Sequence, residues 1–308
     1  MAPAGGAGPH RAWAPSPTAA PSPSAAPGAA CTQALVDRMF DYIIIVDEGI
    51  RGGPRMTMEI LGNGFLARNL SPLAHRHPGT VAMAAGVSWA SGTSDADFAR
   101  EAALLTQAAD RCRATGRRLL FFSTAATGMY GAVDGPGRED SPITPCTPYG
   151  AHKLALERQL QDSGADHLIL RLGHLVGTGQ PPHQLIPALI QQMRKGSVRI
   201  QRAAARDLID VRDVVTVIDR LLAQGLCGET VNVASGTAVP VERIVDHLET
   251  RLGLSVRRRY EEAGAHHVIS TEKLRALVPE TAAMGFGPGY YRRVLDAFIA
   301  TADPSTAA

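Results

Sequence analysis

Lysine, long apolar runs and an excess of charge of either sign are all scarce in this chain of 308 residues. The three lysines are Lys153, Lys195 and Lys273, and 31 basic residues stand against 29 acidic ones. A net charge of +2 gives no electrostatic basis for binding nucleic acid or an anionic membrane surface. No apolar run approaches the ~20 residues that a membrane-spanning helix needs. We therefore expect no nucleic-acid partner and no membrane partner.

Cysteine is also sparse, and its placement excludes two kinds of site. Cys31, Cys112, Cys146 and Cys227 lie far apart, and the chain contains no C-x-x-C pair. This spacing does not indicate a disulfide framework, so a reducing compartment, the cytoplasm, is expected. We expect no metal site from these residues.

The first 55 residues differ in composition from the rest. The stretch MAPAGGAGPHRAWAPSPTAAPSPSAAPGAA is low-complexity sequence that cannot bury enough apolar surface to become ordered, and it lacks the pattern of a secretory signal. The later stretch RMFDYIIIVDEG could form a strand. Alternatively, Arg51-Gly52-Gly53 can be encoded by a purine-rich ribosome-binding sequence. Because it stands just upstream of Met56 and Met58, translation of the native protein would then start at one of these two methionines. Residues 1–55 are thus expected to be disordered or not part of the native protein.

A glycine-rich turn follows the first apolar segment after this region. MEILG predicts a strand over residues 58–62, and GNGFLA then leads into a predicted helix over residues 67–77. The pattern G-x-G-x-x-A between strand and helix is typical of dinucleotide binding, because the glycines allow a tight turn and close backbone approach to a pyrophosphate. A turn that merely joins a strand to a helix would look the same. The candidate cofactor-binding residues here are Gly62, Asn63, Gly64, Phe65, Leu66 and Arg68.

Strands and helices alternate along the rest of the chain. Ser94 is a suitable N-cap and Gly116 a suitable terminator for one long helix between them. Strands that alternate with helices of this length predict a parallel α/β sheet. The predicted strands cover residues 80–86, 117–124, 167–173 and 229–235, and the predicted helices cover residues 94–115, 149–162, 182–196, 239–253 and 289–302.

Tyr149 and Lys153 lie four positions apart in the stretch TPYGAHKLALE, which places them on one face of a helix. The strand over residues 117–124 ends in Ser123 and Thr124, at the carboxyl edge of the sheet where such folds bind ligands. A Y-x-x-x-K pair alone carries little weight, but this context makes it a candidate catalytic pair.

These landmarks together resemble the extended short-chain dehydrogenase/reductase family, the NAD-dependent epimerase/dehydratase group. GNGFLA, FFSTAATGMYG and TPYGAHKLALE follow the order of the family's glycine turn, Ser/Thr strand end and PYG-x-x-K segment. LRLGHLVGTGQ and RDLIDVRDVV look like two later family segments. The resemblance covers about residues 58–300. It implies a Rossmann-like doubly wound parallel sheet with a small C-terminal substrate lobe, and a homodimer through helices 94–115 and 149–162.

The resemblance assigns proton transfer to Tyr149. A free phenol ionises near pH 10, too high for a general base at neutral pH, and an adjacent ammonium favours the phenolate. Lys153 would supply that charge and, by analogy, hydrogen-bond the nicotinamide ribose. Thr124 or Ser123 would orient the same substrate oxygen, and Thr127 is a third candidate because the loop after the strand is longer than is common in the family.

Four further residues near the motifs have expected roles. Glu157 is expected to be a solvated partner rather than a catalytic acid, and His152 to point off the catalytic face. His174 stands where sugar-nucleotide enzymes often carry Asn, and is either a substrate contact or a satisfied core residue. Arg206 begins the segment that holds a phosphate in those enzymes, and either does so here or pairs with a nearby aspartate.

The chain departs from the family just after the glycine turn. The helix over residues 67–77 runs almost directly into the strand over residues 80–86, where family members usually place another strand, helix and strand. We therefore expect a shortened sheet that lacks the usual second and third strands. The strand over residues 58–62 should then lie at or near an edge.

A second departure concerns the cofactor. No Asp or Glu occurs over residues 60–94, so the acidic residue that normally binds the adenosine ribose is absent. Arg68, Arg76, His75 and His77 could instead meet a 2′-phosphate, which favours NADP over NAD. The arginines could also be solvated helix charges, or the dinucleotide site could be degraded.

The expected division of the chain follows from these motifs. Residues 56–175 and 206–235 would form the dinucleotide-binding domain, residues 176–205 and 236–300 the substrate lobe, and residues 301–308 a tail.

The expected function is that of an NAD(P)-dependent oxidoreductase or epimerase/dehydratase acting on a hydroxyl or carbonyl carbon of a sugar-like or small metabolite, with secondary metabolism as one setting. One alternative is an isomerase or lyase that dispenses with the cofactor and uses Tyr149 as acid and base. Another is a non-catalytic binding protein that retains the fold. The set Thr124, Tyr149 and Lys153 argues against the binding protein, whereas the missing acidic residue keeps the first alternative open.

Overall fold

The structure is a computed structural model that describes residues 57–87, 93–131, 135–264 and 266–302. The chain divides into residues 1–41 and 42–308, and every described residue belongs to the second part. The predictions made for residues 1–55 therefore lie outside the described residues.

Parallel strands form a five-stranded central sheet in the order β1-β2-β3-β4-β8. Each forms from an apolar segment that the sequence singles out, although β2 is shorter than predicted. This confirms the predicted α/β class with a parallel sheet. The strands are β1 (Glu59–Leu61), β2 (Thr80–Met83), β3 (Arg118–Thr124), β4 (His167–Leu172) and β8 (Glu229–Val233).

The strand β1 lies at the edge of this sheet and pairs directly with β2, as the shortened-sheet prediction requires. No strand occurs over residues 62–79, all of which the structure describes. The connection consists of α2 (Phe65–Leu70) and the 3₁₀ turn η2 (Ser71–Leu73). The predicted helix over residues 67–77 is thus wrong in its bounds: it begins earlier and gives way to a 3₁₀ turn that starts with Ser71 and Pro72, because proline has no N–H for an α-helical bond.

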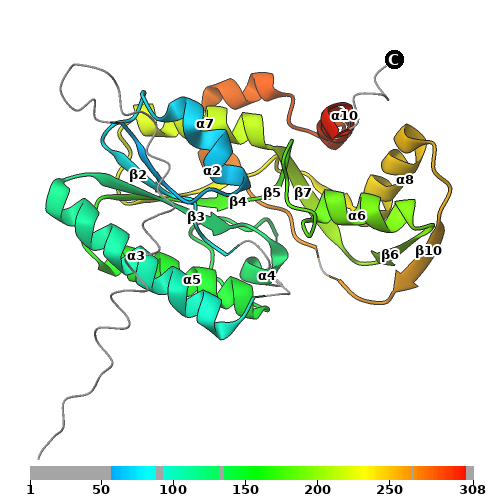
Figure 1. Ribbon diagram of the computed structural model, residues 1–308, viewed down its shortest axis with the longest axis horizontal. Helices are drawn as coiled ribbons and strands as arrows, with labels where there is room; N and C mark the ends of the chain where they lie inside the picture. Colours follow the sequence, from blue (N-terminus) through cyan, green and yellow to red (C-terminus); the bar gives the residue numbers. More distant parts are fainter. Residues whose placement is uncertain (1–56, 88–92, 132–134, 265, 303–308) are drawn as a thin grey trace, which may run out of the picture. The chain divides into compact units, whose positions relative to one another are not determined.

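Helices cover both faces of the sheet (Figure 1). The helices α3 (Asp95–Thr115) and α5 (Pro148–Asp162) pack side by side on one face, and α2 and α7 (Val211–Ala223) contact each other on the other. The long helix α3 ends as predicted: Ser94 and Asp97 form a capping box, and Gly116 is left-handed with φ 66°.

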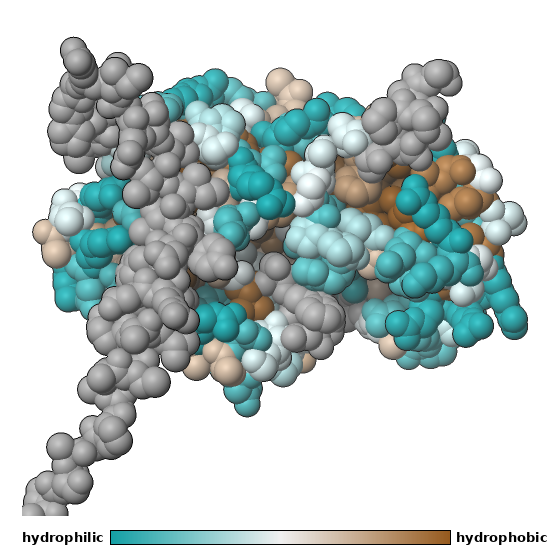
Figure 2. Space-filling model, viewed as in Figure 1, coloured by the Kyte–Doolittle hydropathy of each residue, from teal (hydrophilic) through white to brown (hydrophobic). Residues whose placement is uncertain are grey.

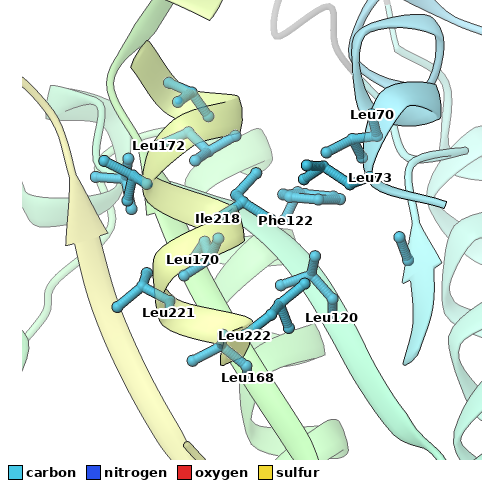
Figure 3. Close-up of a cluster of buried hydrophobic side chains, with 14 of the residues drawn as sticks. Leu70, Leu73, Leu120, Phe122, Leu168, Leu170, Leu172, Ile218, Leu221 and Leu222 are labelled. Carbon is cyan, nitrogen blue, oxygen red and sulfur yellow. The ribbon is translucent and has the colours of Figure 1, made fainter. Parts of the chain in front are cut away.

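The core sits in two layers because consecutive side chains of a strand point to opposite faces. In β3, Leu120 and Phe122 join the cluster beneath α7, whereas Leu119 and Phe121 join the cluster beneath α3 and α5. Figure 3 shows the first of these clusters, with leucines of β3, β4, α2, η2 and α7 directed toward one another.

The chain after β4 builds a second group of elements around a separate apolar core, which draws on residues 176–204, 208 and 239–299. On the face shown in Figure 2, hydrophobic residues gather over the helices α6 (Leu185–Arg194) and α8 (Val241–Leu252). No described helix is long and apolar enough to cross a membrane. The division into domains itself stays a prediction.

The strands of this second group form a three-stranded sheet and a separate pair. The sheet consists of β5 (His174–Val176), β7 (Ala205–Asp210) and β9 (Ala238–Pro240), and the pair of β6 (Ser197–Gln201) and β10 (Arg257–Glu261). The helices of the group are α6, α8 and α10 (Tyr290–Ala302). Two short helices, α4 (Thr127–Tyr130) and α9 (Glu272–Leu277), and the 3₁₀ helix η3 (Pro279–Met284) complete the described elements.

Candidate active site

A cavity of about 530 Å³ opens at the carboxyl ends of β2, β3 and β4. The register of β3 and β4 sets Thr124 beside Leu172, and the chain continues from Leu172 through Gly173 into β5. The cavity therefore lies where the central sheet ends and the second group of elements begins, as expected for an open α/β sheet. Its lining includes Gly64, Phe65, Leu66, Ser123, Thr124, Tyr149, Lys153, His174, His183 and Arg206.

The glycine turn borders this cavity, and its two glycines serve different purposes. Gly62 has φ 118°, and a Cβ there would lie 2.7 Å from the carbonyl oxygen of Ala84, so only glycine fits against the end of β2. A Cβ on Gly64, in contrast, would meet no atom within 4 Å. The protein itself therefore does not need a glycine at position 64, and the open space beside its backbone suits a ligand.

Arg68 is held against this turn. Its guanidinium donates to the carbonyl oxygen of Asn63 at 3.1 Å and to that of Gly179 at 3.3 Å. Arg76 and His77, by contrast, both bond to Asp219 of α7. Of the basic residues predicted to meet a 2′-phosphate, the structure thus brings Arg68 to the turn and ties Arg76 and His77 to α7.

The first turn of α5 presents Tyr149 and Lys153 to the cavity. Thr147 caps the helix by accepting from the N–H of Gly150 at 3.1 Å, and Pro148 occupies the first turn. Tyr149 is half-buried, and Lys153 is buried with its Nζ 5.7 Å from the centroid of the Tyr149 ring. The predicted pair therefore lies on one face of a helix and lines one cavity.

Ser123 and Thr124 also line the cavity from the end of β3. The Thr124 hydroxyl accepts from the N–H of Ala126 at 3.1 Å, and Ser123 lies 3.8 Å from the sulfur of Met129. The side chain of Thr127 lies outside the described residues, so the choice among the three hydroxyls stays open.

A buried carboxylate that the sequence analysis did not single out contacts the pair. Glu101 of α3 accepts from Lys153 Nζ at 2.6 Å, and its other oxygen lies 2.9 Å from Nε2 of His152. Lys153 also donates to the carbonyl oxygen of Phe122 at 3.3 Å. His152, expected to point off the catalytic face, is thus linked to Lys153 through Glu101.

The prediction that Glu157 is solvated is wrong. Glu157 is 1% exposed and forms a bidentate pair with Arg171 of β4, with oxygen–nitrogen distances from 2.7 to 3.2 Å. Arg171 also donates a hydrogen bond to the hydroxyl oxygen of Tyr130 at 3.1 Å, and that hydroxyl in turn donates to Oδ1 of Asn232 at 2.6 Å. This network joins α5 to the sheet, because a buried carboxylate requires a charged and hydrogen-bonded partner.

His174 and Arg206 lie together on the other side of the cavity. Burial lowers the pKa of His174 to about 3, and Arg206 and His267 add to this effect, so the imidazole is neutral at physiological pH. Burial also lowers the pKa of Arg206. The two aspartates considered as partners for Arg206 have other bonds, since Asp207 accepts from Ser235 and Gly236 and Asp210 accepts from Arg212.

The electrostatics of the pair depart from the simple expectation. Burial raises the pKa of Tyr149, the charge of Lys153 lowers it, and the charge of Glu101 raises it by less than Lys153 lowers it. Burial lowers the pKa of Lys153, but Tyr149 and Glu101 outweigh this and the net pKa is raised. Lys153 thus stays cationic, while Tyr149 stays protonated.

Glu101 and His183 are cavity-side residues that sequence reasoning missed. Glu101 shares the buried face of α3 with Leu105, Ala108 and Cys112, and a charge within such an apolar stripe was an available signal. His183 stands in a loop before α6, where no periodic pattern singles it out. Among the residues that the structure describes, no three His, Cys, Asp or Glu side chains gather to hold a metal ion.

Comparison with known proteins identifies the family. The chain is 27% identical over 209 residues to dTDP-6-deoxy-L-talose 4-dehydrogenase (NAD(P)(+)) of Kitasatospora kifunensis, a match that covers 63% of this chain and 65%, just under two thirds, of that relative. RMD of Pseudomonas aeruginosa, solved with NADPH, has a TM-score of 0.64 at 20% identity, covering 79% of this chain and 97% of its own. MoeE5, solved with UDP-glucuronic acid and NAD, has a TM-score of 0.62 at 25% identity, covering 74% and 80%.

The fold likeness to these structures agrees with the parallel sheet described above, and confirms the Rossmann-like class. Residues 61–234, more than half of the chain, match the NAD dependent epimerase/dehydratase family, in agreement with the resemblance carried by the glycine turn and the Tyr149–Lys153 segment. This protein belongs to the NAD dependent epimerase/dehydratase family.

Proposed function

We propose that this protein is an NAD(P)-dependent oxidoreductase or epimerase/dehydratase that acts on a hydroxyl or carbonyl carbon of a nucleotide sugar or a related metabolite. The observation that carries the proposal is that Thr124, Tyr149 and Lys153, from β3 and α5, line one cavity together with the glycine turn. The relatives support the substrate class, because one is named for a dTDP-sugar and another was solved with a UDP-sugar.

In this proposal Tyr149 exchanges a proton with the substrate oxygen. Thr124, or Ser123, donates a hydrogen bond to the same oxygen and fixes its position, which aligns it for proton transfer. Lys153 keeps a positive charge behind the phenol. His174 and Arg206 face the site from the other side, where the arginine suits the phosphates of a nucleotide sugar and the neutral imidazole suits a hydroxyl group.

The site suits the pyrophosphate and nicotinamide half of a dinucleotide better than the adenosine half. The open space beside Gly64 and the ammonium of Lys153 suit the pyrophosphate and the nicotinamide ribose, and the bound dinucleotide would supply or accept the hydride. Beyond the turn, β1 is the edge strand, and residues 62–79 contain no carboxylate that could bind the adenosine ribose. Arg68 beside the turn slightly favours NADP over NAD.

Titration of the purified protein with NADPH and NADH, followed by nicotinamide fluorescence, tests the proposal. We expect saturable binding of both, with NADPH favoured, and Arg68→Gln should remove that preference. Arg199→Gln, an exposed arginine on β6, is the matched control. Absence of binding to either nucleotide would contradict the oxidoreductase proposal.

The edge position of β1 and the missing carboxylate keep a second function open. A cofactor-independent isomerase or lyase would use Tyr149 alone as acid and base. Its signature would be turnover of a nucleotide sugar without added nucleotide and with no response in the NADPH titration, whereas a non-catalytic binding protein would give saturable sugar-nucleotide binding with no turnover.

We further propose a homodimer in the cytoplasm, with α3 and α5 as the contact surface. These helices lie side by side on one face of the sheet (Figure 1). Sedimentation equilibrium should give twice the chain mass, and a monomeric mass at micromolar concentration would count against the dimer.

A further inference from the structure

Glu101 is the buried charge nearest to the Tyr149–Lys153 pair for which the proposed chemistry has no use. Its side chain is 2% exposed, with 2.6 Å to Lys153 Nζ and 2.9 Å to His152 Nε2. The carboxylate also lies over Gly86 at the end of β2, where a Cβ would come within 2.4 Å of Oε1. Because Gly86 lines the cavity, the Glu101 carboxylate packs against the side of Gly86 that faces away from the cavity.

Burial favours a neutral phenol on Tyr149, and Glu101 weakens the opposing effect of Lys153. An ammonium alone beside a buried phenol would stabilise the phenolate, because the two charges would cancel. Here the carboxylate of Glu101 lies 2.6 Å from Lys153 Nζ and offsets part of its charge, so the ammonium stabilises a phenolate on the half-buried Tyr149 less than it would alone. His152, the other partner of Glu101, could restore the balance only by holding a proton.

Other charged groups also face the pair, and Glu157 helps to hold the pKa of Lys153 up. Glu157, on the same helix as Lys153, is paired with Arg171. Across the cavity, His174 is neutral because burial lowers its pKa to about 3. The positive charge of Arg206 lies on the substrate side, together with His183.

We propose that Glu101 is a positioning residue that anchors Lys153 and offsets its charge, so that Tyr149 enters the reaction as a neutral proton donor. The inference rests on the proposed function and specifies the direction of proton transfer, from Tyr149 to the substrate. The O–H bond of Tyr149 breaks as an O–H bond forms on the carbonyl oxygen of the substrate, whose carbon would accept a hydride from the reduced nicotinamide. The resulting phenolate then regains a proton from the buffered solvent. The raised pKa of Tyr149 agrees with this assignment.

Ultraviolet titration of the tyrosine phenolates tests the proposal without any substrate. Each protein is mixed rapidly into buffers of increasing pH, so that absorbance is read before alkaline unfolding. The step that is absent from Tyr149→Phe belongs to Tyr149. In Glu101→Gln, which keeps the side-chain volume and removes the charge, we expect this step to move down by about one pH unit or more. Glu262→Gln, an exposed glutamate outside α3 and α5, should leave it in place.

An unchanged or higher titration step of Tyr149 in folded Glu101→Gln would overturn the proposal. Should that variant fold poorly, Glu101→Asp keeps the charge but withdraws it from Lys153, and the step should still move down, by about half a unit; no shift would be equally contrary. Circular dichroism checks the fold of each variant. The NADPH titration is run in parallel. Absence of NADPH binding in the unmodified protein would refute the proposed function alone. An unshifted Tyr149 titration step in Glu101→Gln, with NADPH binding intact, would refute the role of Glu101 alone.

Discussion

Tyr149 carries one hydroxyl on which the proposed chemistry depends. Tyr149→Phe keeps the ring and its packing beside Lys153 and removes the group that transfers the proton. We expect the rate to fall on the order of 10²–10⁴ with little change in stability. The rate would be followed by nicotinamide absorbance with dTDP- and UDP-sugars as candidate substrates.

The matched control is Tyr260→Phe, which removes the hydroxyl of an exposed tyrosine on β10. It should retain full activity. Full activity in a folded Tyr149→Phe variant would show that the Tyr149 hydroxyl takes no part in the reaction.

His174 makes folding stability depend on pH. Burial lowers its pKa in the folded protein to about 3 from an ordinary 6.5. Below pH 6.5 the unfolded chain therefore gains a proton that the folded protein refuses, and stability is lost as the pH falls from about 6.5 toward 3. In urea unfolding at pH 7 and pH 5, His174→Gln should lose less stability between the two pH values than the unmodified protein. Equal losses would show that His174 is not held neutral.

At the scale of the element, the first turn of α5 depends on a glycine. A Cβ on Gly150 would lie 2.1 Å from the backbone oxygen of Gly128 in α4, and backbone cannot yield as a flexible side chain can. Ala normally stabilises a helix relative to Gly, but here Gly150→Ala should cost about 1–3 kcal/mol by overpacking and displace Tyr149. Thermal unfolding measures the cost. Gly79→Ala, where a Cβ would meet nothing within 4 Å, is the control and should change stability by less than about 0.5 kcal/mol.

Elements that are both apolar and flanked by turn residues were predictable from the sequence. The strands β3 and β4 are such cases, because a strand that is buried on both faces appears in the sequence as a continuous apolar run. The helix α3 is another, because its capping box and terminal glycine mark its two ends. The strand β10 was missed because its sequence, RRRYE, has no apolar alternation and pairs with β6 from a position far away in the chain.

The site followed the same rule. That Tyr149, Lys153 and Thr124 line one cavity could be predicted because a motif orders them, whereas the contact of Glu101 with Lys153 joins positions 52 residues apart. Such a contact depends on how α3 and α5 pack, which no local pattern specifies. The solvated role expected for Glu157 failed for a similar reason, since its partner Arg171 comes from a strand of the sheet.

At the scale of the whole molecule, the order of the strands sets what the cofactor can touch. In doubly wound folds the dinucleotide spans the point where the strand order reverses. Here β1 ends the sheet, so along the described residues the adenosine half would meet little more than α2 and Arg68. We expect reduced nicotinamide mononucleotide to bind within about tenfold of NADH, equivalent to about 1.4 kcal/mol, in the same fluorescence titration. NADH binding more than a thousandfold tighter would show that the adenosine half has a site of its own.

The short edge of the sheet also bears on how long a cofactor stays. An epimerase or dehydratase takes a hydride from a sugar and returns it to the same molecule, so its dinucleotide has to remain bound throughout the cycle. A dehydrogenase exchanges its dinucleotide at every turnover and loses nothing by a loose grip. With β1 at the edge and no carboxylate over residues 62–79, we expect the purified protein to emerge free of nucleotide and to consume it in amounts equal to product, as measured by chromatography of the heat-released supernatant. Nucleotide that co-purifies one to one with the chain would instead mean that this shortened sheet retains its cofactor from one substrate to the next.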